Sequence, residues 1–385
     1  MNHRLTSRSR GLARLLLFVA GATLVGAACS RQSPRAGGAE PGSATAHPGL
    51  LALDHPSSPA TVIAPEAGDE HFARIWQLTH GGQNAEAYFS ADGQRLIFQR
   101  RQAGVVECDQ IHTMDINGAN RRLVSTGEGR TTCGFFFPGA ERILYSSTHH
   151  LSERCPPAPD RSRGYVWPIH EYDIFTARPD GSDLRRLTDA AGYDAEATIS
   201  PDGRRIVFTS MRDGDLDIYV MDAEGRNVRR LTHEEGYDGG AVFSPDGTMI
   251  VYRAHHPGEP GELADYRGLR DAGLVRPNRV EIFVMDADGS NKRQLTRNGA
   301  ANFAPFFHPN GRQIVFSSNV HDRTGRAFSL YMIDVDGSNL RRITHHDGFD
   351  GFPMFSPDGV LLVFGSSRGA REQGEINVFV AEWRE

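Results

Sequence analysis

The sequence of 385 residues lacks an apolar run long enough to span a bilayer. A membrane-spanning helix needs about 20 consecutive apolar residues, whereas the run at residues 15–25 ends after eleven. The sequence also has no phosphate-binding loop, no dinucleotide-binding fingerprint and no His-Glu-x-x-His motif. These absences exclude the nucleotide-dependent enzymes and the zinc peptidases that are recognised by those motifs. Because no catalytic constellation stands out, the sequence favours a protein that is not an enzyme.

The N-terminus predicts export. Four arginines precede the short apolar run, and small residues follow it at positions 26–28. This order is typical of a secretory signal, which we expect over residues 1–28. Cys29 follows at once, an arrangement that resembles a bacterial lipobox and implies that Cys29 carries the lipid. We therefore expect a lipid-anchored protein of the periplasm or outer membrane.

Beyond the signal, charge and composition limit the partners. Removing residues 1–28 takes away four arginines and no acid, which lowers the formal net charge from −6 to −10. A negative balance of this size argues against nucleic acid as a partner. Residues 29–70 are rich in Ser, Pro, Gly and Ala, so they predict a flexible linker. We expect a monomer that contacts the membrane through its lipid anchor only.

A repeated pattern occupies residues 71–385. Leu-Arg-Arg-Leu-Thr, about ten further residues and Phe-Ser-Pro-Asp-Gly recur with small variations. The spacings between successive copies are 47, 63, 44, 64 and 48 residues, and a period of this size is typical of propeller blades. The turns of the copies lie at Ala91, Pro138, Pro201, Pro245, Pro309 and Pro357.

Each unit predicts four antiparallel strands. In one unit these are residues 195–200, 205–210, 217–222 and 228–232, rich in β-branched and aromatic residues and separated by turn residues. Residues 74–79 look like a fourth strand without the first three, and residues 378–383 like a third strand without a fourth. We expect an all-β, six-bladed β-propeller closed by the N-terminal strand in the last blade, with Ile75 opposite Phe379.

The units resemble the PD40 (TolB-type, WD40-like) propeller repeat. The matching stretches are residues 243–247, 282–291 and 340–344, and the resemblance covers about residues 71–385. It implies the fold, but not a function, because one fold hosts many different sites. TolB proteins carry an α/β domain before the propeller, where this chain has only the polar linker. The resemblance therefore does not carry a role in the Tol–Pal system to this chain.

Two insertions predict the functional face. Residues 149–171 and 255–279 both interrupt a connection between second and third strands, so they should rise from the same face. Loops longer than about 12–15 residues in a compact fold are usually functional or disordered. We expect this face to recognise an envelope protein, a peptide or a glycan.

Short polar residues precede each turn by seven positions and should form a ring at the channel mouth. One interpretation is that they cap turns; the other is a ligand-binding polar funnel, to which Glu86 and Glu196 would add charge. Phe303, Phe349 and Phe352 would suit a peptide or sugar ring there, or would pack between blades. The ring residues are Asn84, Thr131, Asp194, Asp238, Asn302 and Asp350.

Histidines at the insertions allow an alternative function. His149, His150, His255 and His256 begin the two insertions and His170 ends the first. Imidazoles that converge from two blades would bind a divalent metal ion; otherwise they are solvated or hydrogen-bonded. Some oligogalacturonate lyases use PD40-like propellers with a His-bound metal, so the alternative is a metal-dependent enzyme of polysaccharide-lyase type. We expect no other cofactor.

Three cysteines remain after Cys29, namely Cys108, Cys133 and Cys155. Two of them could pair in an exported protein, and the odd number leaves one thiol over. The sequence does not determine which two pair.

Overall fold

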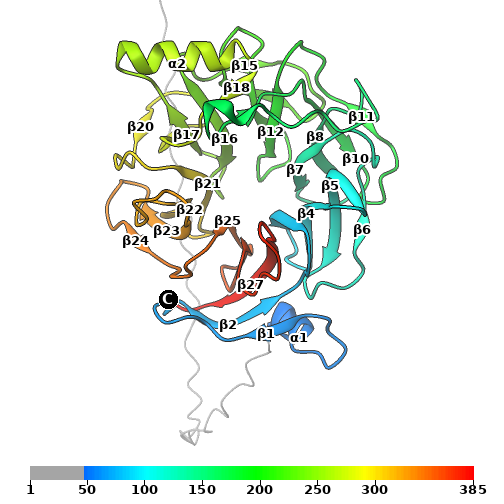
Figure 1. The fold of residues 1–385 in the computed structure, drawn as a ribbon. Coiled ribbons are helices and arrows are strands. Elements are labelled where there is room, and N and C mark those ends of the chain that lie inside the picture. The colour runs from blue at the N-terminus through cyan, green and yellow to red at the C-terminus, as the bar shows by residue number, and fades with distance from the viewer. Residues whose placement is uncertain (1–46) are drawn as a thin grey trace, which may run out of the picture. The chain divides into compact units, whose positions relative to one another are not determined.

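Six β-sheets stand in a ring around a central channel (Figure 1). The computed structural model describes residues 47–385. The expected export signal, Cys29 and the first part of the expected linker lie outside the described residues. Within residues 47–385, no helix combines the length and apolar character needed to cross a bilayer.

Each of these six sheets is one blade, and all strand pairs within the blades are antiparallel. In blades 1–5 the innermost strand comes first in the chain. Blade 1 contains β3 (Gln83–Phe89), β4 (Arg95–Gln102), β5 (Val106–Asp115) and β6 (Arg122–Leu123). Blade 2 contains β7 (Thr131–Phe136), β8 (Ile143–Ser147), β10 (Asp173–Ala177) and β11 (Arg185–Arg186). Blade 3 contains β12 (Asp194–Ile199), β13 (Arg205–Ser210), β14 (Asp217–Asp222) and β15 (Arg229–Arg230).

The remaining blades follow the same plan. Blade 4 contains β16 (Tyr237–Phe243), β17 (Met249–His255), β19 (Glu281–Asp286) and β20 (Arg293–Gln294). Blade 5 contains β21 (Asn302–Phe307), β22 (Gln313–Ser318), β23 (Ser329–Asp334) and β24 (Arg341–Arg342). Blade 6 contains β25 (Asp350–Phe355), β26 (Leu361–Ser366) and β27 (Asn377–Trp383), then two N-terminal strands. The six-bladed, four-stranded plan predicted from the repeats is confirmed.

The N-terminal strand closes the ring as expected, but in a different register. Strand β2 (Phe72–Gln77) pairs antiparallel with β27, and Figure 1 shows the two side by side in blue and red. Ile75 lies opposite Ala381 and Gln77 opposite Phe379, so the predicted pairing of Ile75 with Phe379 was wrong by two residues. The strand starts early because Phe72 enters the core, with its ring centroid 5.7 Å from that of Phe364.

The expected linker is ordered from residue 47 onward, which corrects the prediction of a flexible segment up to residue 70. It forms α1 (Pro48–Leu53) and β1 (Thr61–Ile63), and β1 pairs with β2 as a fifth strand of blade 6. Leu53 is 2% exposed and packs with the core between blades 6 and 1. A short apolar face therefore anchors a segment whose average composition is that of a linker.

The repeated sequence motifs hold the blades together. In the Ser-Pro-Asp-Gly turn, the Ser200 hydroxyl donates to Asp202 Oδ1 (2.5 Å) and accepts from the Arg205 backbone N–H (2.9 Å). In the Leu-Arg-Arg-Leu-Thr motif, Thr232 Oγ1 accepts from the Ile218 N–H (2.9 Å) and donates to Asp217 Oδ1 (3.1 Å). The first motif closes a hairpin, and the second ties the outermost strand to its neighbour.

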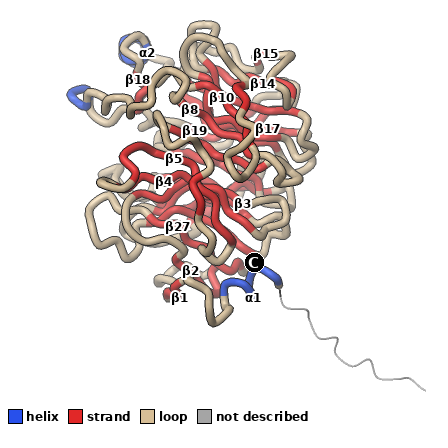
Figure 2. Tube along the Cα trace, turned by 90° about the vertical axis from the view of Figure 1, so that its right-hand side faces the viewer, coloured by secondary structure: helices blue, strands red, loops and turns tan. Residues whose placement is uncertain are grey.

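The two insertions rise from the same face and meet. They contain β9 (Trp167–Pro168), a 3-10 turn (Arg161–Arg163), α2 (Pro260–Arg270) and β18 (Leu274–Val275). Strands β9 and β18 pair, with Trp167 opposite Val275. Figure 2 shows α2 and β18 projecting beyond the sheets on one side. We call this the insertion face.

A disulfide joins Cys108 on β5 to Cys155 in the first insertion, across 47 residues of sequence. Cys133 on β7 is a free thiol. The pairing left open by the sequence is therefore 108 with 155, which fixes the first insertion to blade 1.

Candidate functional site

A bulge in the innermost strand of every blade aims one residue into the channel. The bulge residue has a left-handed φ between 50° and 59° in all six blades, and the strand register shifts at each bulge. A bulge of this kind redirects a side chain and is often found beside functional sites. The six bulge residues are Glu86, Cys133, Glu196, Gly240, Ala304 and Phe352, and all of them line one cavity.

This cavity has a volume of about 1220 Å³ and opens among the loops of the insertion face. Tyr165 and Trp167 reach it from the first insertion and Asn278 from the second. The loop between β22 and β23 adds residues 319, 320 and 322–326 to the rim. The channel and the two insertions therefore form one site.

A buried ion pair forms one wall of the cavity. Arg253 on β17 is 7% exposed and contacts both Glu196 and the Tyr237 hydroxyl, the latter at 2.6 Å. Glu196 also accepts from Thr209 Oγ1 and from the Gly240 N–H, each at 2.9 Å. The guanidinium lies over the Trp167 ring, 5.3 Å from its centroid. These hydrogen bonds hold the ion pair in place, and the guanidinium in turn faces the indole of Trp167.

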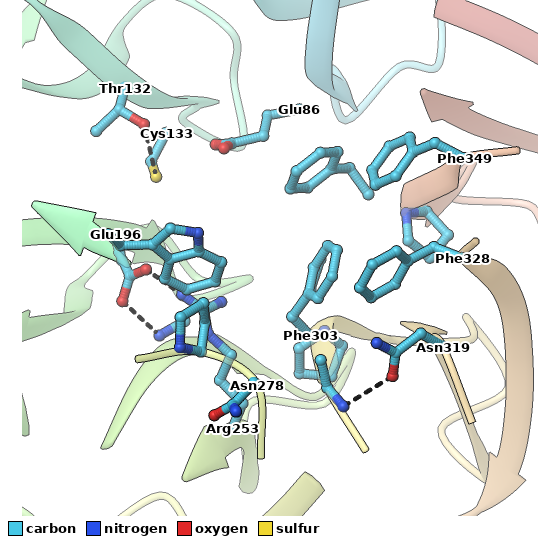
Figure 3. A pocket seen from close by; sticks show the side chains of 18 of the residues that line it. Glu86, Thr132, Cys133, Glu196, Arg253, Asn278, Phe303, Asn319, Phe328 and Phe349 are labelled. Carbon is cyan, nitrogen blue, oxygen red and sulfur yellow. Dashed lines mark hydrogen bonds and ion pairs between the residues drawn. The ribbon is translucent and has the colours of Figure 1, made fainter. Parts of the chain in front are cut away.

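Glu86 is the bulge residue of blade 1, and within residues 47–385 no base forms an ion pair with it. Its carboxyl is hydrogen-bonded by the Cys133 thiol. Burial is the largest cause that raises the pKa of Glu86, to about 7, and the nearby Glu196 carboxylate raises it further. Figure 3 shows Glu86, Cys133 and Glu196 facing the open space of the cavity.

Phenylalanines form the opposite wall (Figure 3). Phe303 lies 5.0 Å from Phe328, 5.5 Å from Phe352 and 6.4 Å from Phe349 by ring centroids. Packing between blades, the alternative role considered for the phenylalanines, does not account for them fully, since all four rings also line the cavity. One half of the site is thus polar and the other aromatic.

Three aromatic rings from different blades meet across the channel. Tyr88, two residues beyond the bulge of blade 1, stacks on Phe135 of blade 2 at 4.6 Å. Phe306 of blade 5 lies 6.4 Å from each of them. Because the innermost strands run away from the insertion face, these rings form the floor of the cavity.

The six polar residues of the expected ring lie elsewhere. Asn84, Thr131, Asp194, Asp238, Asn302 and Asp350 are at most 1% exposed, and none of them lines the cavity. They hydrogen-bond within the fold: Ser318 Oγ, for example, donates to Asn302 Oδ1 at 2.7 Å. Of the residues assigned to the channel mouth, only Glu86 and Glu196 face the cavity.

The charged members of this ring have a regular counter-ion. The residue eighteen positions later is a cation wherever the ring residue is Asp, with nitrogen–oxygen distances of 2.8–3.2 Å. Where the ring residue is Asn or Thr, that later position holds Gln102, His149 or Val320. A buried carboxylate needs a counter-ion. The presence of one for every Asp of the polar ring therefore indicates that the ring has a structural role. The pairs are Asp194–Arg212, Asp238–His256 and Asp350–Arg368.

The five histidines proposed as metal ligands are not brought together. Those of the first insertion belong to blade 2 and those of the second to blade 4, and blade 3 separates them. His150 pairs with Asp173 (2.8 Å), and His256 with Asp238 and Glu234. The ring of His149 packs at a tilt against that of Phe175, with centroids 4.2 Å apart. His170 Nε2 lies 3.5 Å from Arg130, and His255 ends β17. Within residues 47–385, no three His, Cys, Asp or Glu side chains are placed to hold a metal ion.

A serine, a histidine and a carboxylate are connected at the edge of blade 6. Ser367 Oγ lies 3.2 Å from His346 Nε2, and His346 Nδ1 lies 2.8 Å from Glu66. Ser367 Oγ also accepts from the Phe349 N–H, just as Thr148 and Asn319 accept from backbone N–H groups at the equivalent position of blades 2 and 5. This shared role identifies Ser367 as a backbone cap.

Cys133 gives a test of the cavity's environment. Burial, followed by the nearby carboxylates, raises the pKa of this thiol well above its ordinary value. We expect iodoacetamide at pH 8 to alkylate Cys133 at least about tenfold more slowly in the native protein than in urea. Peptide mapping should find Cys108 and Cys155 alkylated only after reduction. Rapid native alkylation of Cys133 would contradict the raised pKa of its thiol.

Comparison with known proteins agrees with the fold. Residues 169–263 match the family described as the TolB beta propeller domain, PD40. A putative TolB from Agrobacterium tumefaciens is 19% identical over 79% of this chain and 91% of that chain, with a TM-score of 0.54. TolB from Acinetobacter baumannii is 19% identical over 79% of this chain, with a TM-score of 0.52, and this chain spans 64% of its length.

An oligogalacturonate lyase in complex with manganese is 17% identical over 85% of this chain and 97% of that chain, with a TM-score of 0.49. Among curated proteins, none matches the sequence. Identities of this size reflect the fold alone. The chain is a six-bladed β-propeller, and its residues 169–263 match the family described as the TolB beta propeller domain, PD40.

Proposed function

We propose that this chain is an envelope-tethered binding module that recognises a protein, a peptide or a glycan at its insertion face. The observation that supports this is the cavity of about 1220 Å³, which the two insertions border and which has a polar and an aromatic half. Binding sites typically combine apolar walls with a few placed polar groups. The cavity exceeds the usual size of a small-molecule site, so a segment of a protein partner fits it best.

The disulfide between Cys108 and Cys155 supports export, because disulfides persist in oxidising compartments. Anchoring through a lipid on Cys29, and a monomeric state, are part of the proposal. The alternative, a metal-dependent lyase, has less support, since the five histidines considered as metal ligands lie in separate blades.

The test is capture of a partner from envelope extract by the tagged protein. The double variant Tyr165→Ala/Trp167→Ala should lower capture at least about tenfold, because aromatic anchors carry much of the binding energy at interfaces. The matched control, Leu184→Ala/Leu340→Ala, removes two apolar side chains that are 40% and 46% exposed on the opposite face. It should capture normally.

Equal capture by the Tyr165/Trp167 variant, with its circular dichroism spectrum unchanged, would refute the assignment of the binding face. Protease treatment of the extract before capture separates a protein partner from a glycan, since only the protein would be lost.

A further inference from the structure

The Glu86 carboxyl receives fewer hydrogen bonds than the Glu196 carboxylate. Glu196 receives a guanidinium, two hydroxyls and a backbone N–H. Of the described residues, only Cys133 donates a side-chain hydrogen bond to Glu86. A thiol is a weak donor, so this carboxyl at a cavity wall has unused acceptor capacity.

The groups that face Glu86 do not neutralise it. From β7 comes the Cys133 thiol and from β12 Glu196, which is already paired with Arg253 of β17. From β5 comes Asp109, whose Oδ2 lies 3.3 Å from Arg130. Arg130 and Arg253 are therefore paired with other acids, and within residues 47–385 no base forms an ion pair with Glu86.

The aromatic wall begins directly beside Glu86. Glu86 and Phe352 are the bulge residues of blades 1 and 6, which adjoin where the ring closes. Phe352 packs against Phe349 at 5.8 Å and Phe303 at 5.5 Å. A ligand whose cationic group reaches Glu86 would therefore place its neighbouring atoms against these rings.

We propose that the cavity recognises a lysine side chain flanked by apolar residues in an extended peptide segment. Glu86 accepts from the ammonium, and the phenylalanine wall takes the flanking apolar side chains. This inference rests on the proposed function and names the ligand chemistry of the same site.

The chemistry of the site favours lysine over arginine. An ammonium is a compact point charge with three donors, which suits a single carboxylate at the end of a cavity. A guanidinium needs a wider, planar acceptor. The aromatic faces beside Glu86 add a favourable interaction with a cation.

The experiment compares two peptides by isothermal titration calorimetry. The first is acetyl-Gly-Phe-Lys-Phe-Gly-amide, and the second is identical except that its lysine is Nε-acetylated, which removes the charge and keeps the stem. We expect the full-length protein to bind the lysine peptide at least about tenfold more tightly at pH 8, since hydrogen bonds to charged groups are worth a factor of this order or more. Because the change is made in the peptide, this arm does not depend on how a variant folds.

The matched variants are Glu86→Gln, which removes the carboxylate, and Glu224→Gln, which changes an exposed turn residue on the opposite face. The preference for the charged lysine should disappear in the first and persist in the second. Since the pKa of Glu86 lies at about 7, affinity for the lysine peptide should rise roughly tenfold from pH 6 to pH 8 in the unmodified protein. The acetylated peptide should not show this rise.

Three results would overturn the inference: equal affinity for both peptides, a preference that survives in Glu86→Gln, or no measurable binding of the lysine peptide at millimolar concentration. The proposed function is tested separately by the Tyr165/Trp167 variant. If that variant loses capture while the peptides fail to discriminate, the binding face stands and only the lysine assignment falls.

Discussion

The substitution Arg368→Met is expected to lower the free energy of unfolding by about 3–5 kcal/mol. The Arg368 side chain is 3% exposed and joins two buried carboxylates, Asp350 at 2.8 Å and Asp69 at 2.6 Å. Removing the guanidinium leaves both acids buried without their arginine, which costs more than the pair contributes when it is intact. Urea denaturation followed by circular dichroism measures the change.

The controls separate charge from packing. The triple variant Asp69→Asn/Asp350→Asn/Arg368→Met should recover most of the loss, because blade 5 already carries the neutral pair Asn302 and Val320 at these positions. Arg226→Met removes an arginine that is 70% exposed, and it should change stability by less than about 1 kcal/mol. A triple variant as unstable as Arg368→Met would show that packing of the arginine stem, not its charge, holds the blade.

The Arg368 network also shows why the N-terminal segment was mistaken for a linker. The average composition of residues 29–70 is that of a linker, and it hides one short helix and one carboxylate, Asp69, that reaches the core. The contact of Asp69 with Arg368 spans 299 residues of sequence, and no local pattern encodes a contact of that range. The strand β2 was predictable because a repeat lacking its partner strands is visible in the sequence, whereas its register depends on the packing of Phe72.

The candidate site was predictable in position but only partly in its residues. The two insertions lie on the same face, as predicted, because strand alternation alone determines which connections share a face. The ring of polar residues was displaced by two positions, because a bulge redirects the chain and turns Glu86 and Glu196 into the channel. Aligning the repeats at the bulge would have found Cys133 and Phe352 as well. The repeats could not reveal the contact between Arg253 and Trp167, since Trp167 lies in an insertion outside the repeated pattern.

The pairing of each Asp of the polar ring with a later Arg or His was present in the sequence. It becomes visible when the six repeats are compared with one another at a separation of eighteen residues. This comparison would have favoured the structural interpretation of the polar ring over a ligand-binding funnel. The histidine at position 256 belongs to this set, so its role as a counter-ion of Asp238 was also encoded.

The substitution Glu86→Gln is expected to stabilise the fold at pH 8 and to do so much less at pH 5. The pKa of Glu86 is about 7 in the folded chain, against an ordinary value of 4.5. Between these values the unfolded chain releases the proton and the folded chain keeps it, so stability falls as pH rises to about 7. The difference in the free energy of unfolding between Glu86→Gln and the unmodified protein should therefore grow by about 2–3 kcal/mol between pH 5 and pH 8.

Urea unfolding of both proteins at pH 5, 6, 7 and 8 measures this growth, with Glu224→Gln as the control that should follow the unmodified protein at every pH. A constant difference between Glu86→Gln and the unmodified protein would contradict the raised pKa. A carboxyl that destabilises the fold at neutral pH is typical of a site kept for binding, because function often retains a locally unfavourable residue. Glu86→Gln should thus raise the stability of the fold and remove the preference for the charged lysine peptide. Both effects should follow the ionisation of Glu86.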